Sequence, residues 1–163
     1  MDYHDFTTTF TVDQTPEQAF AAINDVRGWW SGEIDGNTDK HGEEFTYRYQ
    51  DIHYSKQRIT EFVPGRRVAW LVRDAYLNFV EDETEWIGTE ITFDITRKGN
   101  QTEIRFSHVG LADHECFNVC SNAWAYYING SLRSLITTGK GQPNENEDAA
   151  LANEGKPTPA PTT

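Results

Sequence analysis

The sequence predicts a single α+β domain in which an antiparallel sheet of six strands packs against one long C-terminal helix. Three observations support this prediction. Apolar and polar residues alternate through several short segments separated by tight turns, as in neighbouring antiparallel strands. Two short helical segments follow the first strand. Near the C-terminus, apolar residues recur every three or four positions over residues 113–138, which is typical of a helix that buries one face.

The N-terminal elements are a strand and two short helices. Residues 3–12 are rich in threonine and phenylalanine, with the apolar residues on one parity. Thr15 is a favourable N-cap, and Gln18 completes a capping box three residues later. A helix is therefore expected over residues 16–24. The stretch NDVRGWWSG (24–32) then predicts one short helical turn between two glycines.

Five further strands are expected, each joined to the next by a turn or loop. They are residues 43–50, 54–63, 66–73, 84–97 and 102–109. In the fourth of these, Ile87, Ile91, Phe93 and Ile95 share one parity, so that face is expected to be buried. Pro64-Gly65 and Lys98-Gly99-Asn100 are turn sequences, and short turns indicate an antiparallel meander.

Residues 73–86 form a longer connection than a hairpin requires. They include Tyr76, Leu77 and Phe79 ahead of an acidic run. Long loops with apolar residues often cover a site, so these three residues are predicted to form a lid. The alternative is an extension of the strand that packs on the C-terminal helix.

The C-terminal helix is expected to bury a stripe of side chains against the sheet. The stripe comprises Cys116, Cys120, Ala123, Trp124, Tyr127, Ser131, Leu135 and Thr138. Gly139 and Gly141 end the helix. Residues 143–163 are rich in Pro, Glu and Ala without periodicity, which predicts a disordered tail after a domain of residues 1–142.

Composition and charge restrict the partners. The formal net charge is −12, which opposes binding to nucleic acid and to anionic membranes. No apolar run is long enough to span a bilayer, and the N-terminus lacks the pattern of a signal peptide, so a cytoplasmic location is expected. Cys116 and Cys120 are then expected to be reduced thiols. No cofactor motif is present, and the spacing of His114, Cys116 and Cys120 splays them around a helix, so no metal site is predicted.

Four stretches, taken in order, carry a family resemblance: TVDQTPEQAFAAINDVRGWW, ITEFVPGRRVAW, GTEITFDITRKGNQTEIRFSHVG and NAWAYYINGSLRSLITTGKGQP. They resemble the START and birch-pollen-allergen (SRPBCC) superfamily, and within it the branch named after the activator of the heat-shock protein 90 ATPase. The resemblance covers residues 6–143. It implies a helix-grip fold, in which a curved sheet wraps the last helix and encloses a cavity.

The predicted binding cavity lies between the sheet and the C-terminal helix. Its candidate lining residues are Trp30, Tyr47, Trp70, His108, Cys120, Trp124 and Tyr127. An aromatic lining with a few polar tips is typical of a small-molecule pocket, although each aromatic residue could equally be ordinary core. Trp29 and Trp30 are expected to point about 100° apart on a short helix, with Trp29 in the core and Trp30 toward the cavity. His108 is either a polar contact for a ligand or a hydrogen-bonded core histidine.

These observations favour a cytosolic protein that encloses a small apolar or aromatic molecule. One alternative is an enzyme of the cyclase or hydrolase kind, in which His108 transfers a proton. The other is a partner domain that docks on a chaperone and stimulates its ATPase, as the branch name implies. The sequence contains no G-x-S-x-G, phosphate-binding loop or H-E-x-x-H motif, so no catalytic residue is assigned.

Overall fold

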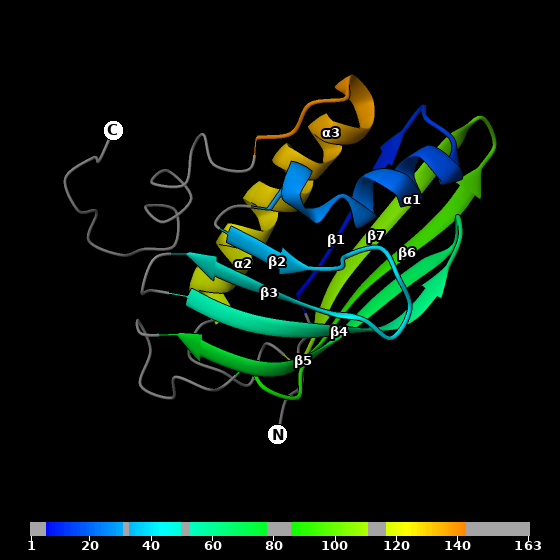
Figure 1. The fold of residues 1–163 in the computed structure, drawn as a ribbon. Coiled ribbons are helices and arrows are strands. Elements are labelled where there is room, and N and C mark those ends of the chain that lie inside the picture. Colours follow the sequence, from blue (N-terminus) through cyan, green and yellow to red (C-terminus); the bar gives the residue numbers. More distant parts are fainter. Residues whose placement is uncertain (1–5, 31–32, 50–52, 78–85, 111–116, 143–163) are drawn as a thin grey trace.

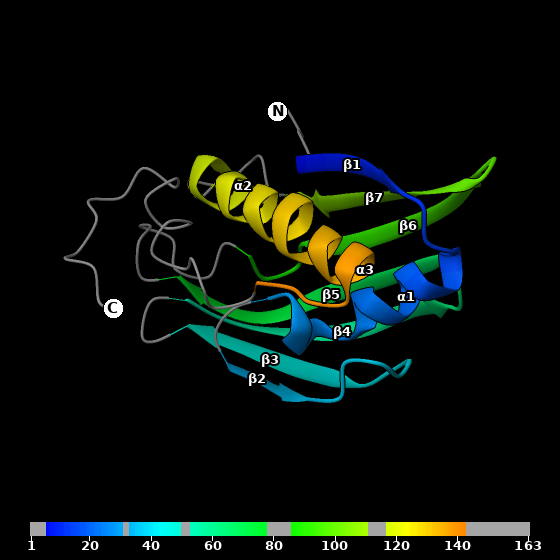
Figure 2. The same cartoon turned by 90° about the horizontal axis from the view of Figure 1, so that it is seen from above.

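A computed structural model describes residues 6–30, 33–49, 53–77, 86–110 and 117–142, and for 117–120 it describes the backbone alone. It confirms the α+β prediction and the helix-grip arrangement. A curved antiparallel sheet has the strand order β1-β7-β6-β5-β4-β3-β2, and one face carries the C-terminal helix (Figures 1 and 2). The strands are β1 (Phe6–Val12), β2 (Glu33–Gly36), β3 (Glu44–Tyr49), β4 (His53–Val63), β5 (Arg67–Leu77), β6 (Glu90–Lys98) and β7 (Gln101–Val109). The helical elements are α1 (Pro16–Asn24), η1 (Val26–Gly28), α2 (Phe117–Ala125), η3 (Tyr126–Leu132) and α3 (Arg133–Thr138).

The sheet has seven strands, so the predicted number of six was wrong. The missing strand is β2, a four-residue edge strand that pairs with β3. Ile34 is its only large apolar residue, so it carries no alternation that the sequence could reveal. β6 also begins later than predicted, because Trp86–Gly88 form a turn in which Ile87 is 44% exposed and Gly88 has a φ of 89°.

The start of α1 follows its predicted signal. The backbone N–H of Gln18 donates to Thr15 Oγ1 at 3.1 Å, and the N–H of Thr15 donates to Gln18 Oε1 at 2.9 Å. Both bonds of the capping box are therefore present, and they satisfy N–H groups that have no partner within the helix.

The C-terminal helix contains a π-helical segment, η3, in its middle. Trp124, Tyr127 and Ser131 are buried as predicted, but the next buried positions are Leu132 and Ile136, together with Ile128. Leu135 is half-buried, and Thr138 is exposed. A π-helix has more residues per turn than an α-helix, so the buried face moves along the sequence after it.

The chain beyond α3 returns to pack against η1. Gly139 ends the helix with a φ of 84°, and the N–H of Gln142 then donates to Ser131 Oγ at 2.8 Å. A Cβ atom on Gly141 would overlap the carbonyl oxygen of Gly28. Residues 139–142 are therefore part of the domain, and the predicted tail of residues 143–163 lies outside the described residues.

This contact predicts opposite effects for two glycine substitutions. Gly141→Ala should lower the free energy of unfolding by about 1–3 kcal/mol, because its methyl group overlaps backbone that must move. Gly130→Ala, in η3, meets no atom within 4 Å and should raise it by about 0.5–1 kcal/mol. Denaturant unfolding of both variants measures the difference. Equal effects of the same sign would contradict the packing of Gly141 on η1.

Candidate functional site

The candidate site is a cluster of aromatic rings between the inner face of the sheet and the C-terminal helix. Trp30 lies near its centre: its ring stacks on Tyr47 of β3, with centroids 4.1 Å apart and 7° between planes. Trp30 also lies 6.1 Å from Trp70 of β5, with 11° between planes, and 5.1 Å from Trp124 of α2. The structure therefore brings four of the predicted lining residues into one group.

Trp29 and Trp30 belong to the same stack. Their rings lie 6.0 Å apart with 10° between planes, so both rings belong to one cluster and not to a separate core and cavity. The physical reason is that η1 ends at Gly28, which places both tryptophans beyond the helical turn. Trp29 also donates from Nε1 to the carbonyl of Ile23 at 3.0 Å, and it has no exposed surface.

Two members of the cluster were not among the predicted site residues. Trp86 stacks on Trp124 with centroids 6.0 Å apart and 12° between planes. His53, the first residue of β4, points edge-on at the rings of Trp86 and Tyr47, at 4.6 and 4.9 Å. His53 precedes the strand predicted at residues 54–63. Trp86 lies within the strand predicted at residues 84–97, but on the parity opposite to Ile91, so the turn at residues 86–88 gives it another face than the one predicted. The presence of a tryptophan beside a long connection was the one available signal for Trp86.

His108 takes part in a directed chain of hydrogen bonds. Trp124 Nε1 donates to His108 Nδ1 at 3.0 Å, and His108 Nε2 lies 2.8 Å from Thr89 Oγ1, which donates to the Trp86 carbonyl at 2.6 Å. An indole N–H can only donate, so Nδ1 is the acceptor and Nε2 carries the proton of the neutral ring. With both nitrogens engaged and no exposed surface, His108 has the geometry of a core histidine rather than of a proton-transfer group.

A second polar group on the inner face is only partly satisfied. Gln57 of β4 donates a short hydrogen bond from Nε2 to Ser55 Oγ, while its Oε1 has no partner. The indole Nε1 of Trp70 on the neighbouring strand is also buried without a partner. Phe45 joins the two residues, because it pairs with Gln57 in register and its ring lies edge-on to Trp70 at 4.9 Å. The cluster therefore contains an unused acceptor at Gln57 and an unused donor at Trp70.

The described rings fill the space around these polar atoms. Trp70 and His108 have no exposed surface, Trp30 and Tyr47 are 3% exposed, Trp124 is 2% exposed and Tyr127 is 5% exposed. Water has no access to the inner part of the cluster. The small exposure that remains belongs to rings on β3, the helix and the segment after η1.

The remaining predicted site residues have different positions. Tyr76 and Leu77 are the last residues of β5, where they pair with Tyr54 and His53, so this part of the connection is an extension of the strand. Leu77 is buried and Tyr76 is 41% exposed. Phe79 and the side chain of Cys120 lie outside the described residues. Among the residues that the structure describes, no three His, Cys, Asp or Glu side chains are grouped as metal ligands.

Comparison with known proteins agrees with this architecture. The model of the activator of Hsp90 ATPase homolog 1-like proteins matches residues 13–137. The chain belongs to this family. No curated relative matches the sequence significantly. None of the described helices has the length and apolar character to span a membrane.

Several solved structures are similar to this chain. The solution structure of the Aha1 dimer from Colwellia psychrerythraea has 25% identity and a TM-score of 0.68, with 85% of this chain and 99% of that chain covered. SSP2350 from Staphylococcus saprophyticus has 18% identity and a TM-score of 0.62, with coverages of 86% and 97%. CalU16 from Micromonospora echinospora has 12% identity and a TM-score of 0.62, with coverages of 94% and 84%. The last two show a shared fold.

The position of His53 predicts a pH dependence of stability. Its side chain is half-buried, but Nε2 has no contact with solvent, and burial lowers the pKa of His53 from 6.5 to about 3. Between these values the unfolded chain binds a proton that the folded protein does not. The contribution of His53 is therefore fully present above pH 6.5 and is lost as the pH falls toward 3.

Unfolding free energies measured between pH 7.5 and 3.5 test this prediction. His53→Phe keeps a ring edge-on to Trp86 and should reduce the decline in stability on the acid side. His41→Gln is the control, because His41 is exposed, and it should leave the decline as it is in the wild type. If the unfolding free energies of the wild type and of His53→Phe declined equally with falling pH, the lowered pKa of His53 would be contradicted.

The hydrogen bond between His108 and Trp124 predicts a coupling between two substitutions. His108→Phe leaves the indole N–H of Trp124 buried without an acceptor, which should cost about 1–3 kcal/mol. Trp124→Phe removes the same bond from the other side, so the double variant should lose about 1 kcal/mol less than the sum of the two single losses. Thr137→Ala, on the exposed side of α3, should combine additively with His108→Phe. Additive losses for His108 and Trp124 would contradict the bond.

Proposed function

We propose that this protein binds a small, flat, apolar or aromatic molecule within the aromatic cluster between the sheet and the C-terminal helix. The observation that carries the proposal is the pair of unused polar atoms, Gln57 Oε1 and Trp70 Nε1. Each buried polar atom without a partner costs about 1–3 kcal/mol, so a core built only for stability gains nothing from them. A ligand that supplies their partners recovers that free energy on binding.

The chemistry of the two atoms defines the polar part of the ligand. Gln57 Oε1 accepts and Trp70 Nε1 donates, so the ligand needs a donor for the first and an acceptor for the second, both of which a hydroxyl or an amide group carries. The surrounding rings favour a flat ligand, because parallel aromatic faces at these separations accept a further ring by offset stacking. A phenol or a similar hydroxylated aromatic compound combines the two properties.

Entry of a ligand requires rings to move, because the cluster is closed in the described residues. Trp30 and Tyr47 are the natural pair to separate. They retain some exposed surface, whereas Trp70 beneath them has none. Binding of this kind requires a minor, open conformation of the protein. The apparent affinity is then lower than the intrinsic affinity, in proportion to the fraction of molecules that are open.

The proposal places the protein in the cytoplasm, in keeping with its composition. The family description also names a chaperone ATPase, and stimulation of such an ATPase is the alternative function. The two unused polar atoms favour ligand binding, because they are buried and cannot contact a protein partner at the surface.

Binding of 2-naphthol and of naphthalene tests the proposal, because the two compounds differ by one hydroxyl group. The wild type should bind 2-naphthol about tenfold more tightly than naphthalene, measured by quenching of tryptophan fluorescence and by shift of the melting temperature. Gln57→Leu removes the acceptor at similar volume and should reduce this preference while naphthalene still binds.

Gln101→Leu is the matched control, since it makes the same substitution at an exposed position of β7. It should keep the preference of the wild type. Failure of both compounds to bind would contradict the proposed function. Binding with an unchanged preference in Gln57→Leu would exclude the amide as the polar contact.

A further inference from the structure

One edge of the sheet lacks the features that usually protect an edge strand. The sheet is open, so β1 and β2 each have one side without a neighbouring strand. Short length and charged residues are common means of protection, and β2 has both, with four residues that include Glu33 and Asp35. β1 has seven residues, FTTTFTV, with no charge and no proline. In Figure 2 no described helix or strand lies beyond β1.

The free side of β1 can form hydrogen bonds with the backbone of another segment. β1 pairs with β7 along its whole length, from Phe6 opposite His108 to Val12 opposite Thr102. In an antiparallel pair, alternate residues direct their N–H and C=O groups toward the neighbouring strand, and the others direct them away from it. About half of the backbone groups of β1 therefore point away from β7. An extended segment can bond to them as an additional strand.

Acidic residues stand at both ends of β1. In the sequence, Asp5 directly precedes the strand and Asp13 directly follows it. Asp13 is exposed, and its Oδ1 accepts a hydrogen bond from Gln101 Nε2 at 3.1 Å. Antiparallel pairing with a second copy of β1 would bring like charges together at both ends, which disfavours it. A segment with Lys or Arg at both ends would meet opposite charges instead.

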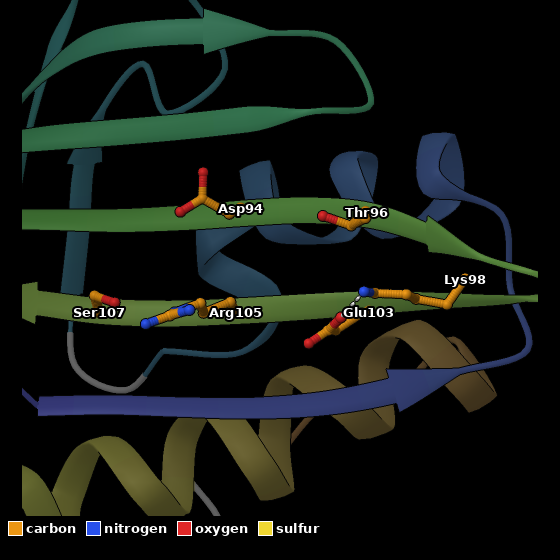
Figure 3. Close-up of a pocket in the computed structure, with 6 residues that line it drawn as sticks. All are labelled: Asp94, Thr96, Lys98, Glu103, Arg105 and Ser107. Carbon is orange, nitrogen blue, oxygen red and sulfur yellow. Dashed lines mark ion pairs between the residues drawn. The ribbon is translucent and has the colours of Figure 1, made fainter.

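The outer face of the sheet beside β1 adds little to this charge preference. Figure 3 shows a hollow on the outer face of β6 and β7, and β1 is the blue strand next to β7. The hollow is lined by two acidic, two basic and two hydroxyl side chains: Asp94, Glu103, Lys98, Arg105, Thr96 and Ser107. Lys98 Nζ lies 3.4 Å from Glu103 Oε1. Positive and negative charges therefore balance on this face, and the acids at the ends of β1 decide the sign.

A second hollow borders β1 on the side of the C-terminal helix. It has a volume of about 300 Å³ and is lined by Asn129, Gly130, Arg133, Ser134 and Thr137. Thr8 links it to β1, because Thr8 Oγ1 donates to Asn129 Oδ1 at 3.1 Å. A Cβ atom on Gly130 would meet no atom within 4 Å, so the hollow is open there. A strand added beside β1 would direct every second side chain toward the helix and this hollow.

We propose that β1 binds an extended segment of another protein as an eighth, antiparallel strand, and that this segment has basic residues at both ends. Backbone hydrogen bonds provide most of the affinity, and the basic ends provide the charge selectivity. The hollow on the helix receives the side chain that comes opposite Thr8. The centre of the segment is uncharged and rich in β-branched residues, which favour strands. The proposal does not depend on ligand binding in the aromatic cluster.

Binding of three labelled peptides to the full chain tests the proposal. KVTVTSTVK has basic ends, and its serine comes opposite Thr8. EVTVTSTVE has the same centre with acidic ends. KVTPPSTVK has two consecutive prolines, one of which removes an N–H that would bond to β1.

Fluorescence anisotropy at low salt should give KVTVTSTVK a dissociation constant on the order of 100 µM, since one short strand makes a small interface. The other two peptides should bind about tenfold or more weakly. Equal binding of all three peptides would overturn the proposal, and so would the absence of binding by KVTVTSTVK up to about 1 mM.

Two further measurements locate the bound peptide at β1. Asp13→Asn removes one end charge at equal size and should reduce the preference for basic over acidic ends about threefold. Asp35→Asn is the matched control, because Asp35 is exposed on the other edge strand, and it should keep the preference of the wild type. Bound KVTVTSTVK should also slow hydrogen exchange of amides in residues 6–12 but not in residues 33–36. Equal effects of the two substitutions, or protection of β2 in place of β1, would overturn the proposal.

Discussion

Trp29 connects the three parts of the domain that have to stay together. Its indole N–H binds the carbonyl of Ile23 at the end of α1, and its own carbonyl accepts from Ser131 Oγ in the C-terminal helix at 2.8 Å. Its ring stacks on Trp70 at 6.3 Å and meets Phe93 edge-on, so it also reaches the sheet. The positions of Trp30 and of the segment after α3 follow from these contacts, because both are attached to atoms that Trp29 fixes.

The sequence was most informative where one periodicity governs a whole element. The alternation in β6 and β7 predicts the inner face that carries Phe93 and His108, and the capping box fixes the start of α1. Prediction failed where a local backbone feature interrupts the period. The π segment displaces the buried face of the helix by one residue, so Ile136 takes the position expected for Leu135.

The candidate site was predictable in composition but not in arrangement. Parity places Tyr47, Trp70 and His108 on the inner face, which the structure confirms. Parity cannot give the direction of an indole nitrogen, so the bond from Trp124 to His108 and the unused Nε1 of Trp70 are visible only in three dimensions. These are the features that separate a core histidine from a reactive one and an ordinary core from a ligand site.

The π segment has a consequence for how insertions and deletions act on this protein. A π turn is equivalent to an α-helix with one extra residue, and α-helical geometry returns when that residue is removed. Loss of a single residue in η3 would therefore restore a regular α-helix and leave α3 in its present orientation relative to α2, whereas loss of a residue in α2 would turn everything after it by about 100°. In the second case Ser131 would leave Trp29, and the chain after α3 would lose its attachment to η1. The helix therefore tolerates the loss of a residue within η3 better than the same loss in α2.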